Sequence, residues 1–262
     1  MKRIITLTTD FGLTDGFVGT MKGVILGINP DVTIVDITHD IAPQNVEQGA
    51  FLFANAARYF PADAIHVVVV DPGVGSARRT IAAQEGETIF VAPDNGVLSS
   101  VLRPSSSVVH LNNPAYWLPR VSNTFHGRDI FAPVAAHLSL GVPLEALGAR
   151  IDDWVQLLGG EAAFRAGDEI AGRIVHIDRF GNIITNIGEE LLAGMHRARL
   201  VVFIGGRAVR GVRQSYSDVA PGELVALISS SWRLEVALRE GSAAQVLGAR
   251  VGDVVSVALD RE

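Results

Sequence analysis

Residues 65–79 read IHVVVVDPGVGSARR, and this stretch is the clearest indication of the fold class. Apart from His66, residues 65–70 are apolar and β-branched. Such a near-continuous run predicts a strand buried on both faces, as in parallel sheets covered by helices. The run ends in Asp71, a Pro-Gly turn and two arginines. Because ligands bind beyond the carboxyl ends of strands in open α/β sheets, the same stretch predicts a polar loop at the ligand-binding edge.

Upstream of this strand, strand-like and helix-like segments alternate. Residues 4–9 and 32–36 are apolar and β-branched, whereas residues 15–28 and 46–59 carry apolar side chains at helical spacing. The order strand, helix, strand, helix, strand predicts a mostly parallel sheet with right-handed crossovers. The first part of the chain is therefore expected to be an α/β domain.

The character of the sequence changes after a segment at 150–168 that gathers glycine and charge. Short β-like runs then recur between Gly-rich turns, at 169–178, 182–187, 198–205, 223–229, 233–238 and 253–259. This pattern predicts a smaller all-β barrel or sandwich. The expected domains are an α/β N-terminal domain over 1–155 and a C-terminal β-barrel domain over 168–262.

Composition excludes several classes of protein. The net charge is −6 and no block of Lys and Arg is present, which argues against nucleic-acid binding. There is no cysteine, so disulfides, thiolate catalysis and Cys-based metal sites are excluded. The N-terminal apolar run is too short for a signal peptide, and no stretch approaches the ~18–20 apolar residues of a membrane span. We therefore expect no membrane partner and a cytoplasmic location.

Familiar cofactor and metal motifs are missing as well. The seven histidines show no HxxxH, HxH or HExxH spacing, so no metal site is expected. The DPGVGS loop lacks the lysine of a phosphate-binding P-loop and does not fit GxGxxG. No cofactor is expected.

Three of the strand-like segments end in aspartate, at Asp10, Asp36 and Asp71. At the carboxyl ends of parallel strands these carboxylates can converge on one crevice. Alternatively, each aspartate begins a turn or caps the next helix. Asp10 is suited to accept hydrogen bonds from a vicinal diol, and Thr14 or Asp15 can cap the helix that follows.

The loop after Asp71 and the segment around His126 each allow a functional and a structural interpretation. Gly75 permits a positive φ or the close approach of a ligand. Arg78 can fold back onto Asp71 and place fixed charge in a crevice, or the two can form a surface ion pair worth little. His126 lies beside Gly127, just before a helix expected near Asp129; such a loop histidine is either a general base or merely exposed.

Two stretches of the second part carry polar groups in suggestive places. Phe180 and Asn182 flank a glycine, where a ring and an amide can stack on and hydrogen-bond a purine. The alternative is a β-turn with a core phenylalanine. Ser229, Ser230 and Ser231 precede another strand, and their hydroxyl and N–H groups can hold a carboxylate.

Long motifs across nearly the whole chain resemble one family. They include TTDFGLTDGFVGTMKG (8–23), VVDPGVGSARR (69–79), TFHGRDIFAPVAAHL (124–138), DRFGNIITNI (178–187) and SSSWRLEVA (229–237). These are similar to the S-adenosylmethionine (SAM) hydrolases that form adenosine, also called SAM hydroxide adenosyltransferases, which are related to the fluorinase and chlorinase enzymes. The segment 78–96 is short, which resembles the hydrolases rather than the halogenases.

The resemblance implies an α/β domain followed by a β-barrel, in a homotrimer that binds SAM at the interfaces between subunits. It implies that Asp71, Arg78 and His126 activate water. Asp10 matches the position that binds the ribose diol. Asp15 and Asp178 match positions at the methionine amino group, Ser230 lies near the carboxylate, and Phe180 and Asn182 match the adenine pocket. Gln44 and Ser231 depart from the halogenases, which have a tryptophan and an arginine there.

The implied chemistry is hydrolysis of SAM to adenosine and L-methionine. Displacement at C5′ of a sulfonium releases a neutral thioether, so the leaving group needs no general acid, and the task is to hold an activated water in line with the C5′–S bond. Neither a metal nor a cofactor is implied, since SAM is the substrate. The alternatives are a halide adenosyltransferase and a non-catalytic SAM or adenosine sensor.

Overall fold

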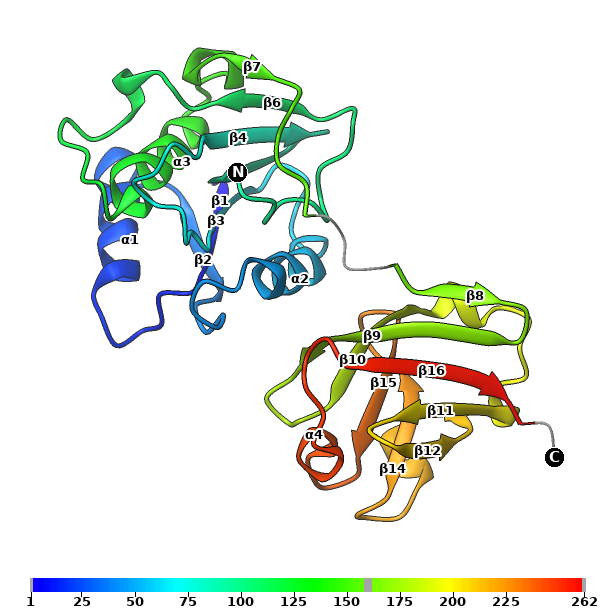
Figure 1. Ribbon diagram of the computed structural model, residues 1–262. Helices are drawn as coiled ribbons and strands as arrows, with labels where there is room; N and C mark the ends of the chain where they lie inside the picture. Colours follow the sequence, from blue (N-terminus) through cyan, green and yellow to red (C-terminus); the bar gives the residue numbers. More distant parts are fainter. Residues whose placement is uncertain (1, 158–161, 261–262) are drawn as a thin grey trace. The chain divides into compact units, whose positions relative to one another are not determined.

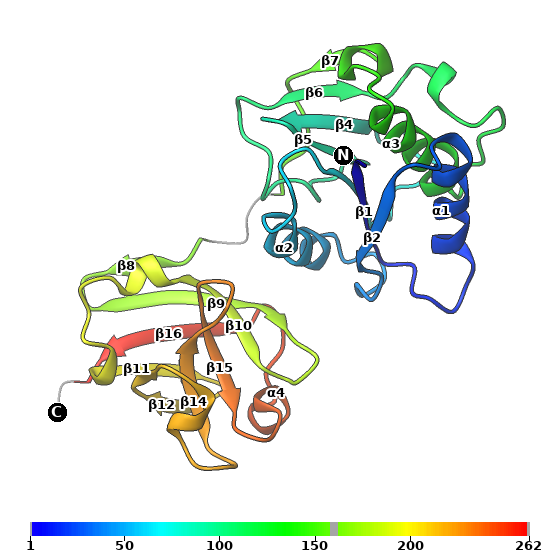
Figure 2. The ribbon, with the colours of Figure 1, turned by 180° about the vertical axis from the view of Figure 1, so that it is seen from behind.

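The chain forms two compact units. The computed structural model describes residues 2–157 and 162–260, and the units divide between residues 158 and 159 (Figures 1 and 2). The predicted segment between the domains, 155–168, includes residues 158–161, which lie outside the described residues, as do 261–262 of the predicted second domain. Each unit has its own hydrophobic core.

The first unit is built on a seven-stranded sheet of order β2-β1-β3-β5-β4-β6-β7. β2, β1, β3 and β5 are parallel to one another, and β4, β6 and β7 extend the sheet from β5 with antiparallel pairings. The elements are β1 (Ile4–Thr9), α1 (Phe17–Ile28), β2 (Thr33–Thr38), α2 (Val46–Ala57), β3 (Ile65–Val69), β4 (Thr80–Glu85), β5 (Thr88–Pro93), β6 (Ser107–His110), α3 (Ala132–Ser139) and β7 (Arg150–Ile151). The predicted α/β fold is confirmed, with its three strands and two helices in place.

Helices cover both faces of this sheet, and the valine run explains why. Val67 and Val69 pack with Met21 of α1 and with α3 on one face, whereas Val68 packs with Phe53 of α2 on the other. All five residues of β3 are buried. Figure 1 shows α1 and α3 on the opposite side of the sheet from α2. Alternate side chains of one central strand therefore hold the two helical layers in place.

Three local predictions need correction. Asp36 does not end its strand: β2 continues to Thr38, and Asp36 pairs in register with Leu7. Its carboxylate instead binds Lys22, with Nζ to Oδ2 at 2.6 Å, and contacts His39. Helix α1 begins at Phe17 with Gly16 as its N-cap and has no side-chain cap, so the predicted cap by Thr14 or Asp15 is wrong.

The helix predicted near Asp129 also begins earlier. Residues Gly127–Phe131 form a π-helical turn that runs into α3, and His126 occupies the N-cap position of this turn without a side-chain capping bond. Single π turns of this kind are frequent at functional sites. The earlier start brings His126 directly onto the end of a helix instead of leaving it on a free loop tip.

The second unit is a nearly closed β structure. Its path runs β12-β11-β16-β9-β10-β15-β14-β13, with β8 paired to β9, and β12 also comes close to β14. Its elements are β8 (Phe164–Ala166), β9 (Glu169–Ile177), β10 (Ile183–Gly188), β11 (Leu200–Ile204), β12 (Arg207–Arg210), β13 (Val212–Arg213), β14 (Leu224–Ile228), β15 (Arg233–Leu238), α4 (Ala243–Leu247) and β16 (Val254–Leu259). The six β-like runs of the sequence are all strands here, which confirms the predicted barrel.

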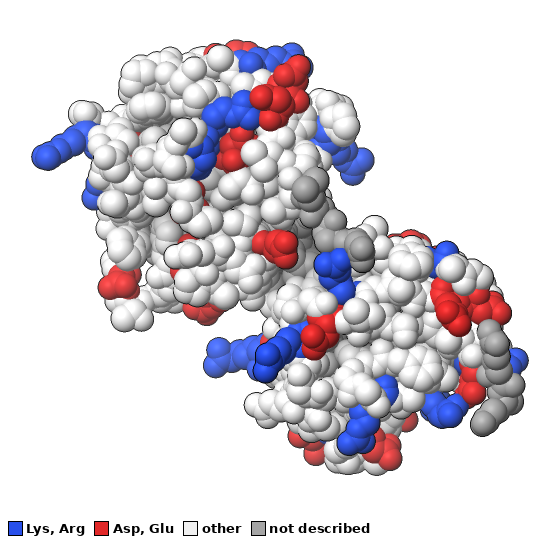
Figure 3. Space-filling model, in the orientation of Figure 1, with Lys and Arg blue, Asp and Glu red and all other residues white. Residues whose placement is uncertain are grey.

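Two surface properties bear on partners. On the face shown in Figure 3, basic and acidic side chains are interspersed among the described residues, and neither sign forms a continuous patch. No helix in the described part of the chain is long and apolar enough to cross a bilayer.

Candidate active site

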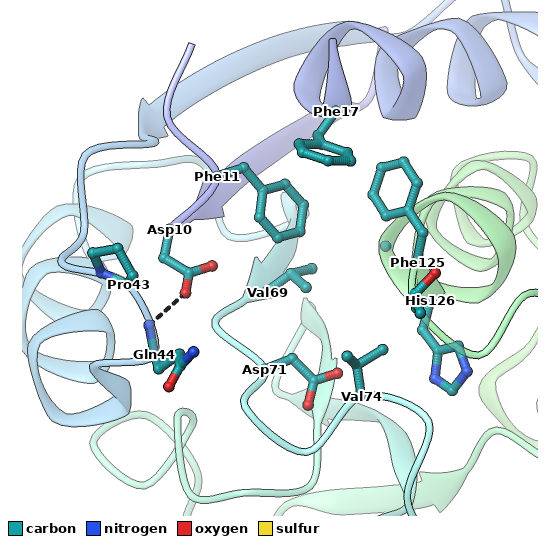
Figure 4. Close-up of a pocket in the computed structure, with 12 residues that line it drawn as sticks. Asp10, Phe11, Phe17, Pro43, Gln44, Val69, Asp71, Val74, Phe125 and His126 are labelled. Carbon is teal, nitrogen blue, oxygen red and sulfur yellow. Dashed lines mark hydrogen bonds between the residues drawn. The ribbon is translucent and has the colours of Figure 1, made fainter. Parts of the chain in front are cut away.

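A cavity of about 300 Å³ opens at the carboxyl ends of β1 and β3 in the first unit. Asp10 follows β1 and Asp71 follows β3, so the parallel pairing of these strands brings both carboxylates to one edge of the sheet. The lining residues come from four segments: Asp10, Phe11, Phe17, Pro43, Gln44, Val69, Asp71, Val74, Thr124, Phe125, His126 and Gly127 (Figure 4). Two of the three strand-end aspartates therefore converge, and Asp36 does not.

Arg78 folds back onto Asp71, as predicted for a pair that places fixed charge in a crevice. Its Nε donates to Asp71 Oδ1 at 2.8 Å, and its terminal nitrogen Nη2 donates to Oδ2, so the pair is bidentate. Only 10% of the Arg78 side chain and 5% of the Asp71 side chain are exposed. The alternative of a surface ion pair is thus wrong, because a buried bidentate pair is held in a fixed geometry.

The same guanidinium nitrogen also reaches His126. Arg78 Nη2 lies 2.9 Å from His126 Nδ1. Because a guanidinium only donates, Nδ1 must accept, and the neutral imidazole then carries its proton on Nε2. Burial, and next the charge of Arg78, lower the pKa of His126, while the charges of Asp71 and Asp129 oppose this shift. Geometry and electrostatics both favour a neutral His126.

A glycine lets the Asp71 loop and the His126 loop meet. Gly75 has φ +77°, and a Cβ there would lie 2.3 Å from the backbone oxygen of Asn123, three residues before His126. The close approach foreseen at Gly75 is therefore made by a neighbouring backbone segment. Any side chain at this position would push the Asp71 loop away from the His126 loop.

A buried carboxylate that sequence reasoning missed holds the His126 loop. Asp129 is fully buried and accepts hydrogen bonds from Ser122 N and Oγ, both at 2.8 Å, and from Arg128 Nε at 2.6 Å. Burial raises the pKa of Asp129, but the bonds from Arg128 and Ser122 outweigh it and the net pKa is lowered. The Arg-Asp dipeptide after His126-Gly127 was the only signal in the sequence.

Asp10 is held more loosely than Asp71. The backbone N–H of Gln44 donates to Asp10 Oδ2 at 2.7 Å, and the side chain is only half-buried. Gln44 has φ +67°, a left-handed conformation that costs a residue with a side chain about 1–2 kcal/mol. The strained turn directs this N–H at the carboxylate and leaves the other oxygen of Asp10 with room for a ligand.

Aromatic rings form the other end of the cavity. Phe17 and Phe125 have ring centroids 5.1 Å apart, and Phe11 lies 5.8 Å from each. Figure 4 shows the three rings gathered together, with Asp71 and the imidazole of His126 at the opposite end. The cavity thus offers an apolar wall facing a charged, hydrogen-bonding one, which suits an organic ligand with one reactive polar centre.

The remaining predicted residues do not line this cavity. Asp15 is exposed in the first unit. In the second unit, Asp178 shapes a turn: Oδ1 accepts from Phe180 N at 2.9 Å and Asn182 N at 2.8 Å, and Oδ2 accepts from Asn182 Nδ2 at 2.9 Å. Phe180 at the tip of this turn is 75% exposed, so the alternative of a core phenylalanine is wrong.

The serines of the second unit also form a turn. Ser229 and Ser231 lie with their Oγ atoms 2.8 Å apart, and Ser230 between them is exposed. In the described residues, no group of three or more His, Asp or Glu side chains is arranged to hold a metal ion.

Comparisons with known proteins agree with this geometry. Residues 5–148 match the SAM hydroxide adenosyltransferase N-terminal domain, and residues 172–256 match the C-terminal domain of the same family. An (R)-S-adenosyl-L-methionine hydrolase of Salinispora tropica is 40% identical, over 97% of this chain and 97% of its own. A fluorinase of Nocardia brasiliensis is 29% identical, over 97% and 96%.

A solved structure has the same fold over the same length. The crystal structure of an uncharacterized conserved protein from Thermotoga maritima superposes with a TM-score of 0.92, at 37% identity, over 97% of this chain and 99% of that one. Both domain models together span most of the present sequence, in the order found here. The chain belongs to the SAM hydroxide adenosyltransferase family.

Proposed function

We propose that this protein hydrolyses SAM to adenosine and L-methionine, with Asp71, Arg78 and His126 activating the water. The observation that carries the proposal is the Arg78 guanidinium, which is shared between the Asp71 carboxylate and His126 Nδ1, and both of these partners line the cavity. The family and the named hydrolase relatives support SAM as the substrate.

The proposed reaction is a single displacement. The water oxygen forms a bond to C5′ as the C5′–S bond breaks. The electron pair of the C5′–S bond passes to sulfur, and one proton of the water is released to solvent. Asp71 has lone pairs left after binding Arg78 and accepts a hydrogen bond from the water. His126, which has its proton on Nε2, donates to the water oxygen and stabilises negative charge there. Arg78 adds a fixed positive charge.

Binding falls to other residues in this proposal. Asp10, with one oxygen occupied by Gln44 N–H, accepts hydrogen bonds from the ribose hydroxyls. Asp15 and Asp178 meet the methionine amino group, Ser230 its carboxylate, and Phe180 and Asn182 the adenine. We further propose that the active protein is a homotrimer, with each site at a subunit interface, and that it acts in the cytoplasm without a cofactor. Light scattering of the purified protein tests the trimer.

One incubation separates the function from its alternatives. Purified protein is mixed with SAM, with and without chloride, and the products are separated by chromatography. We expect adenosine and methionine in equal amounts at a rate independent of chloride. 5′-Chloro-5′-deoxyadenosine would instead identify a halide adenosyltransferase. SAM binding with no adenosine above the uncatalysed rate would identify a sensor.

A further inference from the structure

Arg79, beside the proposed catalytic Arg78, contacts a separate set of groups. Its Nε donates to Asp94 Oδ2 at 2.8 Å, and its terminal nitrogens donate to Asp153 Oδ1 at 2.6 Å and to the backbone oxygen of Asp153 at 2.8 Å. Neither arginine is among the residues that line the cavity, but Arg78 binds two that are, Asp71 and His126. The two adjacent arginines therefore differ in their contacts: Arg78 binds cavity residues and Arg79 does not.

Arg79 and Asp94 form a closed ring of hydrogen bonds. The Asp94 side chain is only 2% exposed, and its backbone N–H donates to the backbone oxygen of Arg79 at 2.9 Å. Its second carboxylate oxygen accepts from Val155 N at 2.8 Å. Arg79 and Asp94 therefore bind each other through backbone and side chain at the start of β4 and the end of β5. The ring fixes both the position and the direction of residue 79.

The ring is directly connected to the guanidinium of Arg78. The backbone oxygen of Arg79, already held by Asp94 N–H, also accepts a long hydrogen bond from Arg78 Nη1 at 3.4 Å. The other terminal nitrogen of the same guanidinium binds Asp71 and His126. An oxygen fixed by the ring is therefore one of the supports of the group at the centre of the site.

On the other side of Arg78, the loop is held by local contacts. Between Asp71 and Arg78 the backbone makes turn bonds, from Val74 N to Asp71 O at 3.2 Å and from Ser76 N to Gly73 O at 3.1 Å, and Arg78 N donates to Ser76 Oγ at 3.2 Å. Residues 75–77 are exposed, although Gly75 lies against Asn123 O. On its C-terminal side, Arg79 and Asp94 tie the chain to the ends of two strands of the sheet.

We propose that Arg79 is a positioning residue, which orients the Arg78 guanidinium toward Asp71 and His126 through its ring with Asp94. The catalytic part of this inference rests on the proposed function. A displacement of about 1 Å at a catalytic group costs on the order of 100-fold in rate. Loss of the ring is therefore expected to lower turnover without changing the cavity residues that bind the ligand.

The kinetic test compares variants at the ring with a matched control. For Arg79→Met we expect kcat to fall about 10- to 100-fold with KM within about twofold. Arg79→Lys keeps the charge but cannot make all three contacts, so its kcat should lie between that of the wild type and that of Arg79→Met. Arg58→Met removes another arginine of the same unit, which makes hydrogen bonds to Asn55 at the end of α2 and packs over the Tyr59 ring, and it should leave both constants unchanged.

A second measurement does not depend on activity. Burial is the largest cause of the lowered pKa of His126, and the charge of Arg78 lowers this pKa further. The charges of Asp71 and Asp129 raise it. If Arg79→Met loosens Arg78, the pKa of His126 should rise toward its ordinary value, as measured by NMR titration of the ring, while Arg58→Met leaves it unchanged.

The outcomes separate the two proposals. An Arg79→Met variant that melts at a lower temperature but keeps the wild-type kcat and the wild-type His126 pKa overturns the positioning role. A wild-type protein that releases no adenosine overturns the proposed function; a shifted His126 pKa in Arg79→Met then still supports positioning of Arg78.

Discussion

The Asp10 loop and the Asp71 loop follow neighbouring parallel strands, yet they hold their carboxylates in opposite ways. Asp71 has both oxygens bound to one buried guanidinium, whereas Asp10 accepts one backbone N–H and stays half-buried. Both reach the same cavity. Asp71 keeps lone pairs beyond its bonds to Arg78, but the bidentate pair fixes their direction, which suits a reactive centre, whereas the more loosely held Asp10 suits the binding of a ligand. We therefore expect two roles for the same residue type at equivalent strand ends.

The largest effect is expected for Asp71→Asn. The amide cannot pair bidentately with Arg78 and leaves a buried guanidinium without its counter-charge. We expect kcat to fall about 100- to 10,000-fold. SAM binding, measured by calorimetry, should change little. Full activity in this variant would contradict the assignment of the Asp71 loop to chemistry.

The second-largest effect is expected for Gly75→Ala in the Asp71 loop, with Gly12→Ala in the Asp10 loop as its comparison. Gly75 and Gly12 have φ +77° and φ +63°, but a Cβ at Gly75 meets Asn123 O whereas a Cβ at Gly12 has no described atom within 4 Å. Both alanine variants carry a backbone strain of about 1–2 kcal/mol. Only Gly75→Ala should also lower kcat, about 10-fold or more, since it separates the loops of Asp71 and His126. Equal kinetics of the two variants would show that the crowding is unimportant.

Asp10→Asn should affect binding rather than turnover. The amide oxygen still accepts from Gln44 N–H, but the charged acceptor for the diol is lost. A hydrogen bond to a charged group contributes about 1.5–3 kcal/mol, so KM should rise about 10- to 100-fold while kcat at saturation is retained. Steady-state kinetics with SAM measures both. A large fall in kcat with unchanged KM would reverse the roles of the two carboxylates.

The smallest effect is expected in the pH dependence of kcat. Burial and then the Arg78 charge lower the pKa of His126, so the imidazole is neutral at pH 7 and becomes protonated only as the pH falls through the lowered value. Protonated Nδ1 no longer accepts from Arg78. The acid limb of the kcat profile should therefore have its midpoint below the ordinary histidine pKa of about 6.5. A midpoint above that value would mean that His126 works in its charged form.

The corrections made by the structure have two physical causes. Asp36 follows an apolar run as Asp10 and Asp71 do, but β2 is the edge strand and simply continues past it, so Lys22 and His39 take its carboxylate. Helix α1 begins at Phe17 without a side-chain cap, because tertiary packing of Met21 and Ile25 outweighs the local capping preference. Local propensity predicted which elements exist better than where they end.

Side-chain periodicity along the chain was enough to predict the elements and their order. The alternation of apolar strands and helices specified the α/β unit, the short β runs specified the barrel, and strand ends placed Asp10 and Asp71 at one edge, because side-chain periodicity is a local property of the chain. The Arg78–Asp71 pair was also foreseen, since the two residues are seven apart in the chain. The contact of Arg78 with His126 and that of Gly75 with Asn123 join segments 48 residues apart, and Arg79 forms a ring with Asp94 across two strand ends. These contacts follow from the packing of the sheet and its loops, which side-chain periodicity does not specify.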